Sequence, residues 1–202
     1  MRKFLLPNLT RKLVCFVVSI VVWWLIHGRI IFPLFGDIFF IDYLVVDINI
    51  DRLNENDIGP LSKWMVGLPL MKQYEWTEFG LGRCLRDALH QENLLLRAIY
   101  YGSNCPCGLA WIVPKGSFNR SPYLRLLVVH PKFTSIGVGT LLMLQVESQV
   151  KIDCRDLFIL VSDFNVDAQS FYQQMGYLKV GEIADYVVPG VSELIFRKSF
   201  KS

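Results

Sequence analysis

The strongest constraint on the fold is an apolar run that leads through a glycine-containing loop into an apolar helix. Residues 123–129 read YLRLLVV, and a nearly continuous apolar run is typical of a central strand covered on both faces. The loop after it contains Gly137 and Gly139, and the pattern of residues 138–152 predicts a helix. A buried strand joined to a helix in this way predicts an α/β protein.

Strand and helix patterns alternate along the chain after residue 42. Strands are expected at 43–53, 94–101, 109–113, 123–129, 157–161, 177–183 and 193–198. Helices are expected near 54–65, 77–90, 138–152 and 165–175. The resulting order, β-α-α-β-β-β-α-β-α-β-β, predicts a mixed sheet, and the chain length fits one domain over 43–202 preceded by a segment at 1–42.

Composition excludes several classes of protein. The net charge is only +3 and no basic stripe is present, so nucleic acid is not an expected partner. The five cysteines are odd in number and scattered, which favours a reducing compartment over a disulfide framework. Cys105 and Cys107 form a close pair, but no second pair accompanies them, so we expect a turn rather than a metal site.

The first 42 residues combine a basic start with an apolar pattern. Residues 13–26 carry no charge, His27-Gly28-Arg29 interrupts the pattern, and apolar residues resume to position 41. A spanning helix needs about 20 apolar residues, which 13–35 supplies only with Arg29 inside. A transmembrane helix, a shallow hairpin, an interfacial helix, a signal peptide without a cleavage site and a helix packed on protein all stay open. We predict membrane association through 13–41, with the 43–202 domain facing the cytoplasm.

The loop at 130–137 has the features of an anion site. A strand-to-helix junction directs unpaired backbone N–H groups and the positive end of the helix dipole towards one point, and a pyrophosphate is a natural ligand there. Gly137 and Gly139 allow close approach of the backbone. No Gly-Lys-Ser/Thr follows, and Leu142 replaces the last glycine of a dinucleotide fingerprint. A purely structural turn explains this loop alone equally well.

A second motif lies one strand further on. Asn165 follows the strand at 157–161, and Ala168, Tyr172 and Gly176-Tyr177 come at fixed offsets after it. Together with Val129-x-Pro131 and the glycine loop, this stretch resembles the GCN5-related N-acetyltransferase (GNAT) family. The resemblance implies the GNAT fold: a mixed sheet of six to seven strands flanked by about four helices, here with an N-terminal apolar helix or hairpin added.

The resemblance also implies roles for particular residues. Acetyl-CoA would be the co-substrate, without a metal, and Asn165 would contact it. Tyr172 would lie near the sulfur and protonate the leaving thiolate, although a packed aromatic beside Phe171 is the alternative reading. The pantetheine arm would pair with the strand backbone and the loop amides would bind the pyrophosphate, which assigns Leu127, Val128, Val129, Ser135, Ile136, Gly137, Val138, Gly139 and Thr140.

The chain departs from the family pattern in two places. The family usually has Gln or Arg at the position of Thr134, Gly at that of Ser135 and a basic residue at that of Ile136. The side chains present here therefore cannot help to bind the phosphates. Leu160 stands where some members carry a Glu base. Other carboxylates could take its place, and the candidates are Asp163, Asp185 and Glu193.

Two functions follow from the resemblance. The first is an N-acetyltransferase that moves an acetyl group from acetyl-CoA to a primary amine, on a small molecule or a protein, by direct attack in a ternary complex. The second is a catalytically silent acyl-CoA-binding sensor or scaffold at a membrane. The sequence names no acceptor, and it leaves a homodimer open.

Overall fold

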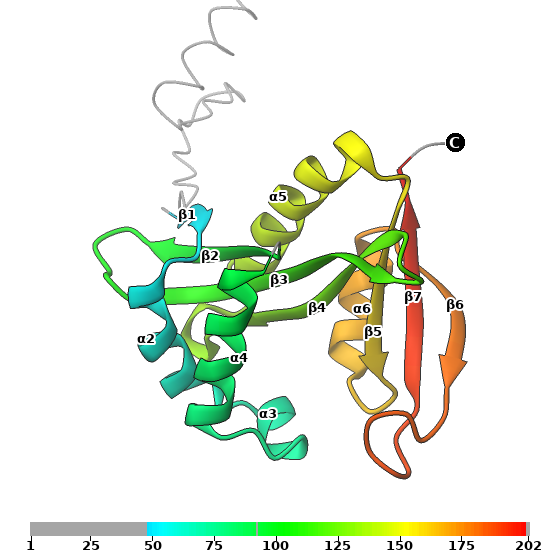
Figure 1. Ribbon diagram of the computed structural model, residues 1–202, viewed down its shortest axis with the longest axis horizontal. Helices are drawn as coiled ribbons and strands as arrows, with labels where there is room; N and C mark the ends of the chain where they lie inside the picture. The colour runs from blue at the N-terminus through cyan, green and yellow to red at the C-terminus, as the bar shows by residue number, and fades with distance from the viewer. Residues whose placement is uncertain (1–47, 92, 201–202) are drawn as a thin grey trace, which may run out of the picture. The chain divides into compact units, whose positions relative to one another are not determined.

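A seven-stranded sheet of order β1-β2-β3-β4-β5-β7-β6 organises the structure (Figure 1). The computed structural model describes residues 48–91 and 93–200, which belong to one unit, Asp47–Ser202. The strands are β1 Ile48–Arg52, β2 Leu94–Tyr100, β3 Pro106–Ser117, β4 Ser121–Val129, β5 Asp156–Ser162, β6 Leu178–Ile183 and β7 Glu193–Ser199. The helices are α2 Glu55–Met65, α3 Pro69–Gln73, α4 Glu78–His90, α5 Val138–Asp153 and α6 Val166–Gln174, with a 3-10 turn at Pro131–Phe133.

Local sequence signals explain where several helices begin. Asn54 and Asp57 form a capping box that starts α2, because each side chain accepts a hydrogen bond from the other residue's backbone N–H. Thr77 starts α4 by accepting a hydrogen bond from the Gly80 N–H. After α6, Gly176 adopts φ 86°, a left-handed conformation that suits glycine at the end of a helix.

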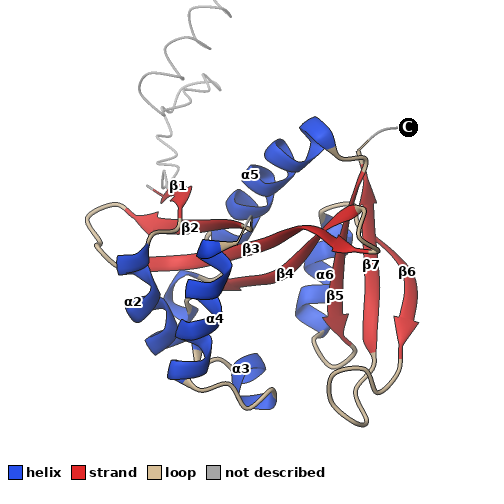
Figure 2. Ribbon diagram, in the orientation of Figure 1, coloured by secondary structure: helices blue, strands red, loops and turns tan. Residues whose placement is uncertain are grey.

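Two apolar cores lie on opposite faces of the sheet. One core joins α2 and α4 to β2 and β3 through side chains such as Leu61, Leu85 and Leu109. The other joins α5 and α6 to the sheet through side chains such as Leu142 and Tyr172. Helices therefore cover both faces, as Figure 2 shows for α4 and α5.

The decisive feature of the sheet is the junction of β4 with β5. These strands pair in parallel at only two positions, Tyr123 with Phe158 and Leu124 with Ile159. At the same point the register with β3 shifts, since Trp111 lies opposite Leu126 while Ile112 lies opposite Leu124. Arg125 is thus the extra residue of a β-bulge, and bulges bend a strand and end its pairing. Beyond it, residues 126–129 separate from β5.

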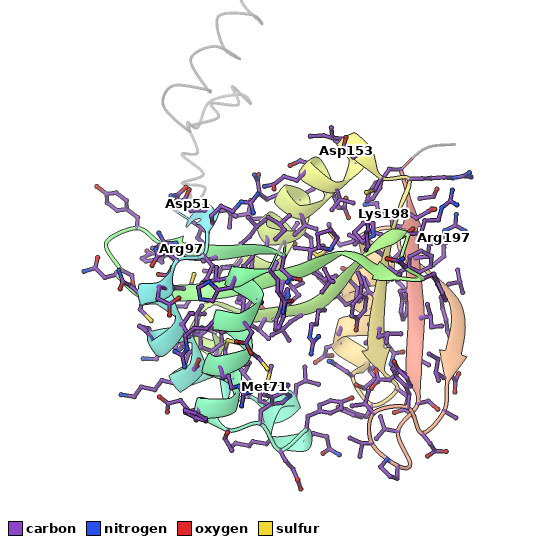
Figure 3. The ribbon with its side chains drawn as sticks, in the orientation of Figure 1. Asp51, Met71, Arg97, Asp153, Arg197 and Lys198 are labelled. Carbon is purple, nitrogen blue, oxygen red and sulfur yellow. The ribbon has the colours of Figure 1, made fainter. Side chains whose placement is uncertain are left out.

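Two ion pairs connect β7 to neighbouring elements. Arg197 donates to Asp156 at 2.8 and 2.9 Å, and Lys198 donates to Glu147 of α5 at 2.6 Å. Arg197 and Lys198 are adjacent on β7 and are labelled in Figure 3. The Tyr177 hydroxyl also donates to Glu147, at 3.0 Å. The C-terminal strands are therefore held to α5 by charge as well as by apolar packing.

The predicted order of elements is confirmed, with two differences. The sequence analysis missed α3, which has only five residues and begins with Pro69. It also expected 109–113 for the strand that extends over Pro106–Ser117. The predictions for residues 1–42 lie outside the described residues. Within 48–91 and 93–200, no helix is long and apolar enough to cross a membrane.

Candidate active site

A cleft of about 460 Å³ opens where β4 leaves β5. We call it the splay cleft, and its lining residues are Leu68, Pro69, Leu70, Leu127, Val128, Val129, Phe164, Asn165, Val166 and Asp167. It brings together Leu127, Val128, Val129 and Asn165, four of the site residues expected from the sequence. The backbone of 127–129 pairs with β3 on one side and has no strand partner in β5 on the other. That edge is free to hydrogen-bond an extended ligand.

The glycine loop places a free helix N-terminus next to this cleft. Gly137 is the N-cap of α5 with φ 91°, and Ser135 also has a positive φ, 63°. The first intrahelical bond runs from the Leu141 N–H to the Gly137 carbonyl at 2.9 Å, so the amides of 138–140 have no acceptor within the helix. The first turn of α5 has no acidic residue and no side-chain cap. The dipole and these amides are therefore available to an anion.

The loop and the cleft meet at Gly139. A Cβ at Gly139 would lie 3.7 Å from the Val129 side chain and 3.6 Å from the Phe171 ring. Ser135 and Ile136 are exposed, and Gly139 and Thr140 are half-buried. Val138 is different, because its side chain is in the core and only its backbone N–H can serve a ligand. Gly139 therefore lies beside Val129 of the cleft, although none of the six residues 135–140 lines the cleft itself.

Asn165 is the N-cap of α6 and Tyr172 lies within this helix, but their surroundings differ. The Asn165 side chain lines the splay cleft and caps α6 by accepting from the Ala168 N–H at 3.3 Å. Tyr172 is 6% exposed and packs edge-on against Phe171 and Tyr177, with ring centroids 5.2 and 5.8 Å away. Burial, and secondarily Tyr123, raises its pKa.

The Tyr172 hydroxyl has no hydrogen-bond partner among the described residues. In that part of the chain, the only fully enclosed side-chain N or O atoms without a partner are Ser62 Oγ and Arg97 Nε. The Tyr172 hydroxyl oxygen is not among them, so protein atoms do not enclose it completely. Tyr172 lines none of the pockets described here, so its expected role at the thioester stays a prediction.

A second pocket, of about 180 Å³, lies beside the first. We call it the Glu193 pocket, and it is lined by Leu70, Met71, Tyr74, Trp76, Leu81, Trp111, Tyr123, Arg125, Leu126, Leu160, Ser162, Val187 and Glu193. Leu70 lines both this pocket and the splay cleft, and Leu126 directly precedes the cleft residues of β4. The two spaces are thus adjacent along one strand.

Among the residues that line this pocket, two have charged side chains, Arg125 and Glu193. Glu193 is 4% exposed and accepts a hydrogen bond from the Tyr74 hydroxyl at 2.5 Å. Ser162 Oγ lies 2.6 Å from the Tyr74 oxygen and 3.3 Å from the carboxylate, and its single proton can be donated to either one. Burial, followed by the hydrogen bond to Glu193, raises the pKa of Tyr74 to about 12, so this phenol is a donor at neutral pH.

The other two candidate carboxylates have structural partners. Asp163 accepts from the Ser192 N–H at 3.1 Å, and Asp185 accepts from the Gly190 N–H at 2.6 Å. Neither lines a pocket described here, whereas Glu193 does. Leu160, at the position where the resemblance predicted that some members carry a Glu base, forms part of the apolar wall of the Glu193 pocket.

Sequence reasoning missed most of the residues around Glu193. Tyr74 comes from the short helix that was not predicted, and Ser162 is an ordinary strand-end residue by pattern. Arg125 could have been noticed in the sequence, because it is the single charged residue inside the apolar run 123–129. Within the described residues, no group of three or more His, Cys, Asp or Glu could hold a metal ion.

The free edge of β4 and the adjoining uncapped helix offer binding groups to an extended ligand that carries an anion. Residues 64–177 match the acetyltransferase (GNAT) family, and the chain belongs to this family. The expected family and fold are thereby confirmed, and the family assignment supports an acyltransferase activity. No curated protein matches the chain significantly.

Solved structures with the same fold include several acetyltransferases. An aminoglycoside 6'-N-acetyltransferase complexed with coenzyme A has a TM-score of 0.63 at 15% identity, over 76% of this chain and 98% of that chain. NAA60 from Arabidopsis thaliana, in complex with a bisubstrate analogue, has a TM-score of 0.62 at 13% identity, over 75% and 97%. YncA from Salmonella typhimurium, with its cofactor acetyl-CoA, has a TM-score of 0.63 at 11% identity, over 77% and 95%.

Proposed function

We propose that the protein is an N-acetyltransferase that moves the acetyl group of acetyl-CoA to a primary amine by direct attack in a ternary complex. The observation that carries the proposal is the separation of β4 from β5 directly beside the uncapped N-terminus of α5. Neither feature alone requires a ligand, but together they offer an open strand edge and an anion site within one cleft.

The residues present fit a coenzyme A thioester. The free backbone edge of 127–129 would pair with the amide-containing pantetheine arm. The amides of Val138, Gly139 and Thr140 would bind the diphosphate, assisted by the turn at Ser135, Ile136 and Gly137. Asn165 would contact the cofactor from the opposite wall of the cleft. Since Thr134 and Ile136 replace the family's polar and basic residues, backbone donors would supply nearly all of this binding.

The reaction needs few groups from the protein. A neutral amine attacks the thioester carbonyl, so a C–N bond forms and the C–S bond breaks. The amine loses its surplus proton to solvent, and the departing thiolate takes a proton from Tyr172. A backbone N–H on β4 would stabilise the developing oxyanion. Because its raised pKa keeps Tyr172 protonated at neutral pH, this phenol is in the form that a proton donor requires.

A catalytically silent acyl-CoA-binding sensor or scaffold is the second candidate function. Leu160 at the usual base position favours it, as does the burial of Tyr172. Membrane association through residues 13–41, with the 43–202 domain facing the cytoplasm, is a further proposal that rests on the sequence alone.

Two measurements on the full chain separate these functions. Calorimetry with acetyl-CoA tests binding, and release of free thiol with a panel of primary amines tests turnover. Binding with turnover supports the transferase, binding without turnover on any amine supports the silent module, and no binding refutes both.

The role of Tyr172 is tested by Tyr172→Phe. We expect turnover to fall about 10²- to 10⁴-fold, the range of general acid catalysis, with acetyl-CoA binding retained. Tyr177→Phe is a matched control, because it removes a neighbouring buried hydroxyl that bonds Glu147 rather than facing a ligand. Tyr177→Phe should lower stability and leave turnover nearly unchanged. Equal turnover in wild type and Tyr172→Phe would show that Tyr172 is not the acid.

A further inference from the structure

The Glu193 pocket contains a buried carboxylate that the described residues leave without a cation. The ion pairs in that part of the chain involve Asp57, Asp87, Glu147, Asp156 and Glu182, but not Glu193. Tyr74 and Ser162 satisfy some of its hydrogen-bonding capacity without neutralising its charge. A buried charge is costly unless a partner of opposite charge accompanies it. An ammonium group entering the pocket would supply that partner.

The pocket also contains a positive charge without an acidic partner. Arg125 lies with its guanidinium carbon 4.7 Å from the centre of the Trp111 ring and forms none of the ion pairs of the described residues. Both Arg125 and Glu193 act on the Tyr123 hydroxyl. Burial raises the pKa of Tyr123 to about 12, with Arg125 opposing the shift and Glu193 adding to it. Tyr123, Arg125 and Glu193 all line this one pocket.

Aromatic and aliphatic side chains form the rest of the wall. Tyr74, Trp76, Trp111 and Tyr123 contribute rings, and Met71 of α3, labelled in Figure 3, contributes an aliphatic side chain. The volume of about 180 Å³ limits the guest to a small body, since a cavity of about 150 Å³ accommodates benzene. Such a wall favours an apolar or aromatic body of about that size.

The pocket is placed to deliver an acceptor to the thioester. On one side it shares Leu70 with the splay cleft. On the other it shares Tyr123, Arg125, Leu160 and Val187 with an outer hollow of about 440 Å³. A guest that occupied both the outer hollow and the Glu193 pocket would lie along Arg125 and reach the wall that Leu70 shares with the splay cleft.

We propose that the Glu193 pocket selects a small zwitterionic acceptor of the amino-acid type, with its ammonium group bound by Glu193, its anionic group by Arg125 and its apolar body by the aromatic wall. The bound ammonium group gives one proton to solvent before the neutral amine attacks the thioester. This inference rests on the proposed function and specifies its substrate class. It disfavours polycationic amines, because a second ammonium group would lie near the Arg125 guanidinium.

Three probes with the same aromatic body test the proposal. Phenylalanine carries both charges, phenethylamine only the ammonium and 3-phenylpropanoate only the carboxylate. Binding of each to the full chain is measured by calorimetry with coenzyme A present, and thiol release from acetyl-CoA is measured for the two amines. We expect phenylalanine to bind at least about 10-fold more tightly than either single-charge probe, since each charged hydrogen bond is worth about 1.5–3 kcal/mol.

Two variants should have opposite effects on the affinities of the two single-charge probes. Glu193→Gln should weaken phenylalanine and phenethylamine about 100-fold, the scale of truncating one partner of a buried charge pair, and leave 3-phenylpropanoate unchanged. Arg125→Gln should weaken phenylalanine and 3-phenylpropanoate and leave phenethylamine unchanged. Arg120→Gln and Glu182→Gln are matched controls, because both residues are exposed and neither lines the pocket.

The outcomes keep the two proposals apart. Failure of acetyl-CoA to bind the wild type contradicts the proposed function itself. If acetyl-CoA binds but phenylalanine does not bind at millimolar concentration, or binds no better than phenethylamine, the substrate class is wrong. Equal losses for all three probes in Glu193→Gln, with unchanged acetyl-CoA binding, would show a general packing role for Glu193 and would also overturn the inference.

Discussion

Replacing Gly137 by Ala tests whether the start of α5 binds the cofactor. Gly137 has φ 91°, and a Cβ there would meet nothing within 4 Å, so the methyl group itself causes no clash. The cost is conformational, since an L-residue in the left-handed region loses about 1–2 kcal/mol. For a domain of this size that lowers the melting temperature by about 2–8 °C.

The same substitution should have a second effect on ligand affinity. The chain relieves strain at position 137 by rotating the turn, which moves the amides of 138–140 away from the diphosphate. Loss of one hydrogen bond to a charged group costs about 1.5–3 kcal/mol, so acetyl-CoA should bind about 10- to 100-fold more weakly. Thr134 and Ile136 cannot compensate, because neither side chain carries a positive charge.

Gly102→Ala provides the matched control. Gly102 has φ 78° in the turn between β2 and β3, and a Cβ there would also meet nothing within 4 Å. The two variants should therefore lose similar stability in thermal unfolding, while calorimetry should show weaker acetyl-CoA binding only for Gly137→Ala. Wild-type affinity in Gly137→Ala, at the same loss of stability, would refute the amide site.

Three further predictions concern the framework around the site. Lys198→Met leaves the largely buried Glu147 without its cation and should lower the free energy of unfolding by about 2–4 kcal/mol in urea titration; a change below about 0.5 kcal/mol would contradict it. Burial, the largest single influence, would raise the pKa of Asp156, but the hydrogen bonds from Arg197 and Ser199 and the charges of Arg197 and Arg155 together outweigh it and lower the pKa below its ordinary value. This ion pair therefore stabilises the fold above about pH 4, and its contribution is lost as the pH falls. In Arg197→Gln the free energy of unfolding should decrease less steeply between neutral and acidic pH than in the wild type. The same decrease in both proteins would contradict a contribution from the pair. Tyr74→Phe removes a donor from a buried carboxylate and should cost about 1–3 kcal/mol of stability, and equal melting temperatures would exclude that contribution.

The sequence predicted the framework well because its signals are local and periodic. The run 123–129 predicted a central strand, and the sequence pattern predicted helices near 54–65 and 77–90, which begin in the structure after the caps Asn54 and Thr77. Leu127, Val128, Val129 and Asn165 were expected at one site, and the structure brings them together in the splay cleft.

The Glu193 pocket could not be predicted from the sequence, for physical reasons. α3 is too short to show a helical period, so Tyr74 had no assigned position. The contact between Tyr74 and Glu193 joins residues far apart in the chain, and no local pattern encodes such a pairing. Glu193 itself was one of three candidates, and only its burial in a pocket distinguishes it from Asp163 and Asp185.

Arg125 connects the two halves of the site. As the bulge residue it ends the pairing of β4 with β5 after Leu124, which opens the edge that would hold the pantetheine arm. The same extra residue places a guanidinium beside Trp111 on the acceptor side. If both proposals hold, the backbone and the side chain would serve different ligands, and Arg125→Gln should separate them. The bulge is retained, so acetyl-CoA affinity should match the wild type in calorimetry, while binding of anionic acceptors should fall. Loss of acetyl-CoA affinity in this variant would show that the Arg125 side chain, and not only the extra residue, keeps the cleft open.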